Sequence, residues 1–135
     1  MSCSSAIYAG NTAVQTVTAS TLTTVNFGTA IRRFGHSCDI SGGNITIRDS
    51  GYYSIDTNFT ITSTAAGEIT VQLYKDGVAI PSGSATFSGA ANITYSVSIP
   101  CIVRNRCCCE NTITATITAA GAAIISNAAI EVEKI

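Results

Sequence analysis

The chain has 135 residues and a mass of 13.9 kDa, which suits one domain built around a single hydrophobic core. Charged residues make up only 11% of the sequence, less than half of the ~25% in an average soluble domain, so intrinsic disorder is excluded. The net charge of −1 also excludes the extended basic surface that a nucleic acid or an anionic membrane requires.

Residues branched at Cβ dominate the composition. The sequence contains 18 Ile, 8 Val and 19 Thr, against 2 Leu and 1 Met. Branched side chains fit a pleated sheet, whereas Leu and Met are among the residues that helices use most. The composition therefore predicts an all-β fold.

The first part of the chain carries few hydrophobic runs. Residues 1–12 are interpreted as an N-terminal arm, and residues 13–135 as a single domain. We expect no signal peptide, because residues 2–30 have neither a basic start nor a continuous apolar run of about 7–15 residues. We expect no transmembrane segment either, because threonines alternate with Ile and Ala in the uncharged stretch 111–130, as in a half-buried strand.

Alternating apolar and polar residues predict eight strands, at residues 14–18, 24–27, 44–48, 52–62, 69–74, 93–103, 113–119 and 129–134. The dipeptide Asp76-Gly77 between two of these runs predicts a two-residue hairpin turn of type I′. Strands of this number and spacing favour an antiparallel sandwich. The apolar members of the runs form the predicted core: Ile55, Phe59, Ile61, Val71, Leu73, Ile93, Val97, Ile99, Ile113 and Ile117.

Three segments carry a family resemblance: residues 44–55 (NITIRDSGYYSI), residues 71–81 (VQLYKDGVAIP) and residues 127–135 (NAAIEVEKI). The pattern is a strand, a Gly-aromatic-aromatic start of the next strand, a hairpin with a short turn, and a closing strand. It resembles the tumour-necrosis-factor/C1q-like jelly roll, especially the bacterial branch typified by the C-terminal domain of exosporium collagen-like glycoproteins. The resemblance covers residues 13–135, but this chain lacks the Gly-X-Y collagen stalk of the exosporium proteins.

Two further segments resemble phage proteins. The RRFG segment at residues 32–35 and the three cysteines at residues 107–109 are similar to parts of uncharacterised proteins encoded by phages of gut Firmicutes. The two resemblances together imply a jelly-roll sandwich in a protein of a phage particle or a bacterial surface.

The jelly-roll resemblance also implies a compact homotrimer. Its contact would use the sheet that holds residues 14–18, 52–62, 93–103 and 129–135. Small side chains let backbones approach closely, and aromatic side chains supply large contact areas. The candidate interface residues are therefore Tyr53, Tyr95, Ala128 and Ile130.

Six cysteines lie at positions 3, 38, 101, 107, 108 and 109, and three interpretations of them stay open. They are free thiols that pack as small hydrophobic groups, or they form disulfides within or between subunits. Alternatively a thiol cluster holds a metal, for which the candidate ligands are Cys38, Cys101, Cys107, Cys108 and Cys109. The two-residue spacer of a zinc knuckle is absent, so no metal and no other cofactor is predicted.

The single histidine, His36, would have to serve any Cys-His or Ser-His catalyst. Its spacing to Cys38 and Asp39 on a loop gives no reason for catalytic geometry, so we predict that the protein is not an enzyme. The neighbouring residues Arg32, Arg33 and Phe34 form a basic-aromatic patch in what we interpret as a long loop. Such a patch is a candidate for docking an acidic partner.

The functional hypothesis is a non-enzymatic structural protein of a phage virion, either a trimeric decoration protein or a fibre knob. Its partners would be copies of itself and other virion or surface-layer proteins, with no nucleic acid and no membrane. One alternative is a structural protein of a spore or cell surface, of the exosporium type. A second alternative is a carbohydrate- or receptor-binding module, because jelly rolls include lectins as well as capsid proteins.

Overall fold

The computed structural model describes residues 5–106 and 110–135, and every regular element within them is a β-strand. No helix in this part of the chain is long and apolar enough to cross a membrane. The strands are β1 (Ala6–Asn11), β2 (Gln15–Val17), β3 (Thr23–Thr24), β4 (Thr29–Phe34), β5 (Cys38–Ser41), β6 (Asn44–Ile47), β7 (Gly51–Ser63), β8 (Gly67–Lys75), β9 (Val78–Gly89), β10 (Ile93–Asn105), β11 (Asn111–Ala119) and β12 (Ala123–Lys134).

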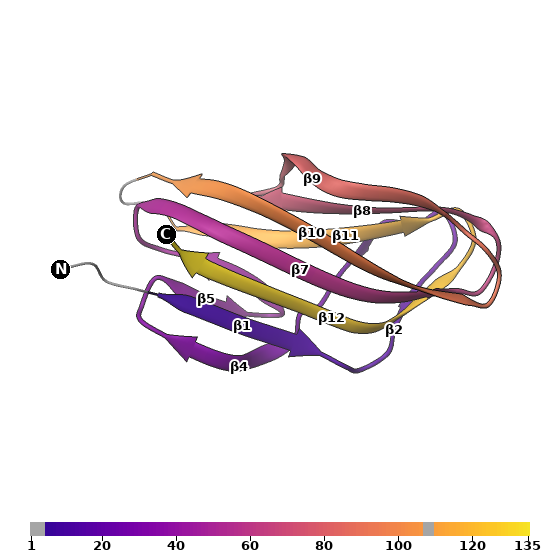
Figure 1. Ribbon diagram of the computed structural model, residues 1–135, viewed down its shortest axis with the longest axis horizontal. Helices are drawn as coiled ribbons and strands as arrows, with labels where there is room; N and C mark the ends of the chain where they lie inside the picture. The colour runs from indigo at the N-terminus through magenta and orange to yellow at the C-terminus, as the bar shows by residue number, and fades with distance from the viewer. Residues whose placement is uncertain (1–4, 107–109) are drawn as a thin grey trace.

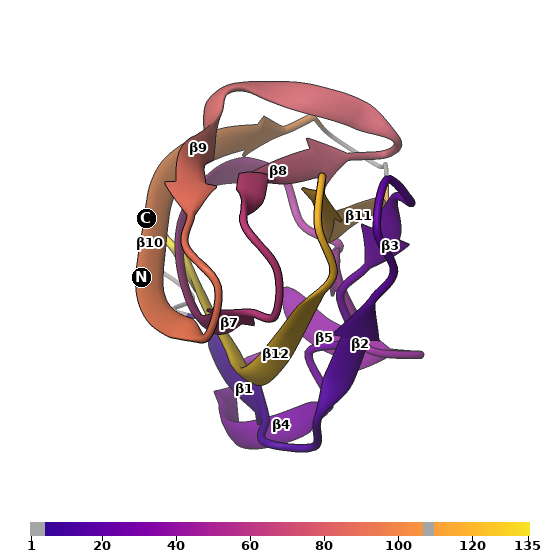
Figure 2. The same ribbon diagram turned by 90° about the vertical axis from the view of Figure 1, so that its right-hand side faces the viewer.

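The strands form two antiparallel sheets that pack face to face (Figures 1 and 2). The front sheet, nearest the viewer in Figure 1, has the order β10-β7-β12-β1-β4, with β2 also paired to β12. The back sheet has the order β5-β6-β11-β8-β9, with β3 paired to β11. From β6 onward the chain passes to the other sheet after almost every strand, which is the connectivity of a jelly-roll sandwich.

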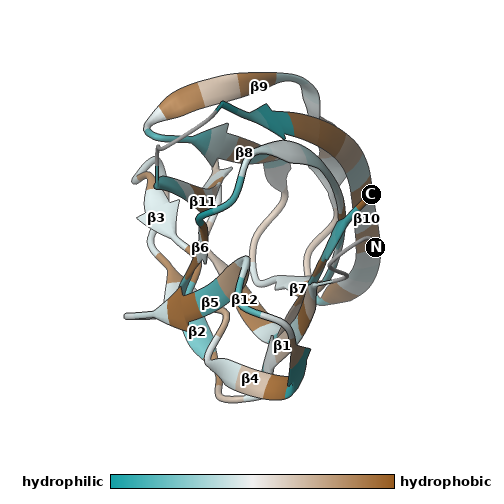
Figure 3. Ribbon diagram, turned by 90° about the vertical axis from the view of Figure 1, so that its left-hand side faces the viewer, coloured by the Kyte–Doolittle hydropathy of each residue, from teal (hydrophilic) through white to brown (hydrophobic). Residues whose placement is uncertain are grey.

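The side-chain period of two along each strand explains the core. Inward positions are buried and outward positions are exposed along β7 and β8, and the hydropathy colours alternate along the strands in the same way (Figure 3). The rings of Phe27 and Phe59 meet in the core with their centroids 5.9 Å apart. The core prediction is confirmed for all its members except Ile93, which is 48% exposed because it begins β10 at the end of the sandwich.

The predicted hairpin turn is confirmed. Asp76 and Gly77 connect β8 to β9, and both residues have the positive φ values that a type I′ turn requires, 52° and 80°. The residues on either side, Lys75 and Val78, are paired across the hairpin.

The interpretation of residues 1–12 as an arm outside the domain is wrong for the part that the structure describes. Residues 6–11 form β1, which lies between β12 and β4 in the front sheet. Ile7 and Ala9 are buried in the core, so this segment belongs to the sandwich. Only two residues of this six-residue strand are buried, and so short an alternation does not identify a strand from the sequence alone.

The segment that contains Arg32, Arg33 and Phe34 is a strand and not a loop. It is the second half of β4, which pairs with β1 and forms one edge of the front sheet. All six residues of β4 are exposed, so the strand lacks the alternation of buried and exposed positions by which the other strands were recognised. Its strand conformation comes from backbone pairing with β1.

Candidate functional site

The outer face of the front sheet is the surface with the most distinctive chemistry. The strand register places Pro100, Asp56, Glu131, Tyr8 and Arg32 in one row across five strands. A second row, displaced by two residues along each strand, contains Ile102, Ser54, Glu133, Ala6 and Phe34. On β10, β7, β12 and β1 these side chains alternate with buried positions and so point away from the core. Arg32 and Phe34 of β4 lie opposite Tyr8 and Ala6 in the register and so share their face.

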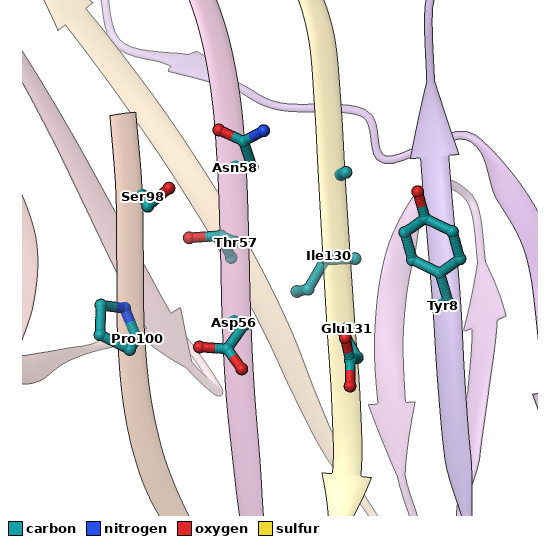
Figure 4. Close-up of a pocket in the computed structure, with 9 residues that line it drawn as sticks. Tyr8, Asp56, Thr57, Asn58, Ser98, Pro100, Ile130 and Glu131 are labelled. Carbon is teal, nitrogen blue, oxygen red and sulfur yellow. The ribbon is translucent and has the colours of Figure 1, made fainter. Parts of the chain in front are cut away.

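Two hollows flank Tyr8 on this face. The larger, with a volume of about 370 Å³, lies on the side of β7 and β10, and Figure 4 shows side chains from four neighbouring strands around it. The smaller, of about 150 Å³, lies on the side of β4 and is bordered by Arg32 and Phe34. Tyr8 and Glu131 border both hollows. The outward residues around the larger hollow are Tyr8, Asp56, Asn58, Ser98, Pro100 and Glu131.

Large apolar side chains are exposed on the same face. Phe34 is 57% exposed and Ile102 is 63% exposed, and both belong to the second row. Tyr8 and Tyr52 are also among the exposed large hydrophobic residues. Several large apolar residues exposed on one face of a sheet are typical of a protein interaction surface.

The charges on this face are unevenly distributed. Asp56 and Glu131 lie directly opposite each other on neighbouring strands, and Glu133 follows two residues later on the same face. Like charges in directly opposed positions destabilise a sheet. The nearest cation in the rows is Arg32, on the far side of Tyr8. The centre of the face would therefore gain from a basic group brought by a binding partner.

The structure corrects three of the four interface candidates. Tyr53, Ala128 and Ile130 point into the sandwich and are at most 1% exposed, so their side chains belong to the core. Ile130 borders the larger hollow, but almost none of it is accessible. The hydroxyl of Tyr53 is satisfied inside the chain, where it donates a hydrogen bond of 2.6 Å to the carbonyl oxygen of Asp49.

The fourth candidate, Tyr95, is half-buried where the edges of the two sheets meet. Its ring packs on Phe87 of β9, with a centroid distance of 4.9 Å. Its hydroxyl accepts a hydrogen bond of 2.8 Å from the backbone N–H of Ala90. Tyr95 therefore holds the turn between β9 and β10 against the core, and this role corrects its assignment to the subunit interface.

The docking candidates on β4 separate into two groups. Arg32 and Phe34 point outward beside Tyr8, whereas Arg33 points to the back sheet and pairs with Asp39 at 3.2 Å. Arg48 pairs with the same carboxylate at 3.1 Å. Hydrogen bonds from the backbone of Ile40 and from Arg48 hold the pKa of Asp39 below its ordinary value. Arg33 thus fastens the edges of the two sheets and is not available as the docking residue that the sequence suggested.

The described cysteines give no sign of a reactive or metal-binding thiol. Cys38 faces the core, and burial raises its pKa to about 11. Burial also raises the pKa of the half-buried Cys101. Within residues 5–106 and 110–135, no group of three or more His, Cys, Asp or Glu side chains is placed to hold a metal ion. Cys3, Cys107, Cys108 and Cys109 lie outside the described residues.

The fold does not bring His36, Cys38 and Asp39 together as a catalytic group. His36 is exposed, Cys38 points into the core, and Asp39 is engaged by two arginines. A nucleophilic thiol needs a lowered pKa and a base within hydrogen-bonding reach. The raised pKa of Cys38 is the opposite condition.

Sequence reasoning missed Tyr8, Asp56, Pro100 and Glu131 as members of one surface. The signal for Asp56 was present, because it alternates with the core residues Ile55 and Thr57 of β7 and must therefore point outward. For Tyr8, no such signal was available, because β1 had not been recognised as a strand. The row could be assembled only once the register between β1, β12 and β7 was known.

Comparison with known proteins identifies the fold class. No family model and no curated protein matches this sequence. Among solved structures, murine APRIL at pH 5.0 superposes with a TM-score of 0.75 at 12% identity, covering 98% of this chain and 99% of that chain. Eiger TNF from S. frugiperda gives a TM-score of 0.68 at 8% identity, covering 98% and 92% respectively. This chain therefore has the TNF-like jelly-roll fold.

A phage protein has the same fold. PRD1 vertex protein P5 superposes with a TM-score of 0.65 at 16% identity, covering 100% of this chain and 99% of that chain. The similarity extends over the whole length of both chains. The structural neighbours therefore include both TNF proteins and a phage vertex protein.

Proposed function

We propose that this chain is a non-enzymatic structural protein that forms a homotrimeric decoration or fibre-knob protein of a phage virion. The observation that carries the proposal is the outer face of the front sheet, where two hollows flank Tyr8 and the apolar side chains of Phe34 and Ile102 are exposed on the two edge strands. The full-length similarity in fold to PRD1 vertex protein P5 supports a place in a phage particle. The TNF-like fold supports assembly of the chain with copies of itself.

The two halves of the outer face differ, which favours a cyclic assembly. The half on β10 presents Pro100 and Ile102, whereas the half on β1 and β4 presents the smaller hollow with Arg32 and Phe34. Contacts between two different surfaces are heterologous, and a heterologous contact that closes on itself produces a ring. A closed trimer covers the apolar side chains of Phe34 and Ile102 in every copy and leaves no growing end, as a discrete knob or decoration requires.

Charge also favours a second copy as the occupant of this face. Asp56 and Glu131 repel each other within one chain, and Arg32 projects from the opposite edge of the same face. In a ring, Arg32 of one copy is brought towards the carboxylates of the next. Electrostatic complementarity of this kind specifies partner and orientation more than it adds affinity.

The non-enzymatic part of the proposal rests on the described titratable groups. The buried thiol of Cys38 is held in its neutral form, and the side chain of His36 is exposed while that of Cys38 faces the core. The carboxylates on the front face lie in an open hollow on a sheet surface, where water is not excluded. A surface of this kind suits binding better than chemistry.

A spore or cell-surface protein of the exosporium type would use the same trimer in a different particle. The resemblance of residues 44–55, 71–81 and 127–135 to exosporium proteins supports this second candidate. The two candidates differ in their gene neighbours and in the particle with which the protein purifies.

The proposal is tested in two steps, first by measuring the oligomeric state and then by identifying the particle that carries the protein. Sedimentation velocity at micromolar concentration is expected to give three times the 13.9 kDa chain mass. Antibody raised against the chain is expected to label intact phage particles after density-gradient purification. A monomer in sedimentation would refute the trimer, and a trimer that is absent from phage particles but present on spores would transfer the function to the second candidate.

A further inference from the structure

A basic groove lies at the end of the front sheet, where β7 begins and β10 ends. It has a volume of about 630 Å³ and is lined by Ser50, Gly51, Tyr52, Arg104, Asn105 and Arg106. The strand register places Arg104 opposite Tyr52, and Asn105 opposite Gly51. The groove does not include Asp56, Glu131 or Tyr8, which border the hollows proposed for the trimer contact.

Positive charge is concentrated at this groove. The chain has only 7 Lys and Arg residues, and three of them, Lys75, Arg104 and Arg106, lie in or beside it. The ammonium group of Lys75 donates a hydrogen bond of 2.7 Å to the carbonyl oxygen of Arg104. Within the described residues these three cations form no ion pair, whereas Arg33 and Arg48 are paired with carboxylates. Their charge is therefore free to attract an anion.

The groove also offers an aromatic face. Tyr52 is 53% exposed, and the guanidinium carbon of Arg104 lies 5.9 Å from the centre of its ring. An aromatic ring presents a flat apolar surface, and a cation within about 6 Å of its centre is attracted to the ring. A ligand that combines a flat apolar side with an anionic group fits both features.

Hydrogen bonds to the carbonyl oxygen of Asp49 hold the wall of the groove in place. The side-chain amide of the buried Asn105 donates a hydrogen bond of 3.0 Å to the carbonyl oxygen of Asp49, which also accepts the hydroxyl of Tyr53. These two bonds anchor the turn that carries Ser50. Gly51 has a φ of 140°, and a Cβ at this position would come within 3.1 Å of Lys134 Cε. A residue with a side chain would be strained at this backbone conformation, so the glycine fits the start of β7 beside the groove.

We propose that this groove binds an acidic saccharide, a sugar unit that carries a sulfate or carboxylate group. Arg104 and Arg106 pair with the anionic group, since guanidinium groups form two parallel hydrogen bonds with such oxyanions. The ring of Tyr52 receives the C–H face of the sugar. A long nucleic acid fits less well, because its binding neutralises a series of phosphates along an extended basic surface. Glycan binding goes beyond the structural role proposed above and adds an adhesive one.

The test is a calorimetric titration with four probes: a heparin-derived hexasaccharide, a galacturonic acid oligomer, maltohexaose and inorganic phosphate. At least one of the two acidic oligosaccharides is expected to bind, with an affinity about tenfold or more above that of the neutral oligosaccharide and of phosphate. Absence of binding by both acidic oligosaccharides overturns the proposal. Equal affinity for inorganic phosphate overturns it as well, because the sugar would then contribute nothing.

Three variants locate the site. Arg104→Gln and Tyr52→Ala are each expected to weaken binding about tenfold. Arg33→Gln removes the same charge on the opposite edge strand, outside both the groove and the proposed subunit contact, and is expected to change binding less than about twofold. An equal loss in Arg33→Gln would mean attraction to overall charge and would overturn the site. Arg106→Gln serves as a second test of the groove if Arg104→Gln alters the circular dichroism spectrum.

Sedimentation of the same variants separates this proposal from the trimer. Arg104→Gln is expected to leave the oligomeric state unchanged while it weakens saccharide binding. A variant that loses the trimer together with the saccharide would show that the groove is a contact between subunits, and this would overturn the saccharide site. A wild-type monomer that still binds the acidic oligosaccharide would refute the trimer alone.

Discussion

The outer faces of the two sheets differ although their inner faces are alike. Both inner faces consist mainly of Ile, Val and Ala residues that pack into one core. Outside, the back sheet is lined with hydroxyl groups, and the hydroxyls of Thr70 and Thr86 lie 3.2 Å apart across β8 and β9. Of the large exposed hydrophobic residues in the described chain, the back sheet contributes Val78 alone, next to the hairpin turn.

The front sheet carries Tyr8, Phe34, Tyr52 and Ile102 on its outer face, with three carboxylates between them. Even here the far end of β7 resembles the back sheet, since the hydroxyls of Thr62 and Thr94 lie 2.9 Å apart. Threonine combines a β-branched shape with a polar group, so it satisfies both the strand and the solvent. A threonine-lined surface is thus stable in water, whereas the apolar part of the front face is a surface that a partner would cover.

The largest expected effect concerns the core that both sheets share. Leu73→Ala on β8 is expected to lower the free energy of unfolding by about 2–5 kcal/mol, because the side chain is fully buried and its loss leaves a cavity. Urea unfolding followed by circular dichroism measures the change. Val78→Ala, at a position that is 69% exposed, is the matched control and is expected to change stability by less than about 0.5 kcal/mol. Similar losses in the two variants would contradict the assignment of the core.

The comparison of the outer faces is tested by placing a charge on each. Tyr8→Asp is expected to weaken subunit association by about 2 kcal/mol or more, because it puts a further carboxylate beside Glu131 at the centre of the proposed contact. Thr70→Asp makes a similar change on the outer face of the back sheet and is expected to leave the association unchanged. Sedimentation equilibrium measures both. If only Thr70→Asp dissociates the subunits, the contact lies on the back sheet, and this result would contradict the proposed contact.

The next prediction concerns Cys38, whose thiol is buried on the inner face of the back sheet. The pKa of Cys38 rises from 9.0 to about 11 on folding, so the folded chain keeps this proton while the unfolded chain loses it. Its contribution is fully present below pH 9 and is lost as the pH rises towards 11, an effect on the order of 2 kcal/mol. Cys38→Ala is expected to remove this part of the alkaline loss, measured by urea unfolding at pH 8 and pH 10.5. An unchanged alkaline loss in the variant would contradict the burial of the thiol.

The smallest expected effect concerns the ion pairs that join the sheet edges. Asp39 accepts a hydrogen bond from the backbone N–H of Ile40 and pairs with Arg48 beside the back sheet and Arg33 of the front sheet, and together these lower its pKa from 3.8. A carboxylate of lowered pKa stabilises the fold above its ordinary pKa, and this contribution is lost as the pH falls below 3.8. Asp39→Asn is expected to cost less than about 1 kcal/mol at pH 7, because the pairs are open to solvent. Urea unfolding at a series of pH values measures the effect. The free energy of unfolding of Asp39→Asn is expected to fall less between pH 4 and lower pH than that of the unmodified protein.

The long strands and their place in the front sheet were accessible from the sequence. Alternation identified residues 52–62, 93–103 and 129–134, and the structure joins them as β7, β10 and β12 of one sheet, as the family resemblance implied. The short strands β1, β4 and β5 were not predicted, nor was the longer β9, along which buried positions do not alternate regularly. β4 has no buried residue at all, and a strand without an alternating burial pattern leaves no period in the sequence.

The candidate site also contains features that the sequence predicts and features that only the structure shows. Tyr53 shares the face of Ile55 and Phe59 in the alternating pattern, so the pattern itself places it in the core, where the structure finds it. The row of Pro100, Asp56, Glu131 and Tyr8 unites residues from four strands that are distant in the sequence. Local sequence determines which side chains of one strand share a face, because that follows from a period of two. Which faces come together depends on register and strand order, and these are decided by long-range backbone pairing that only the tertiary structure contains.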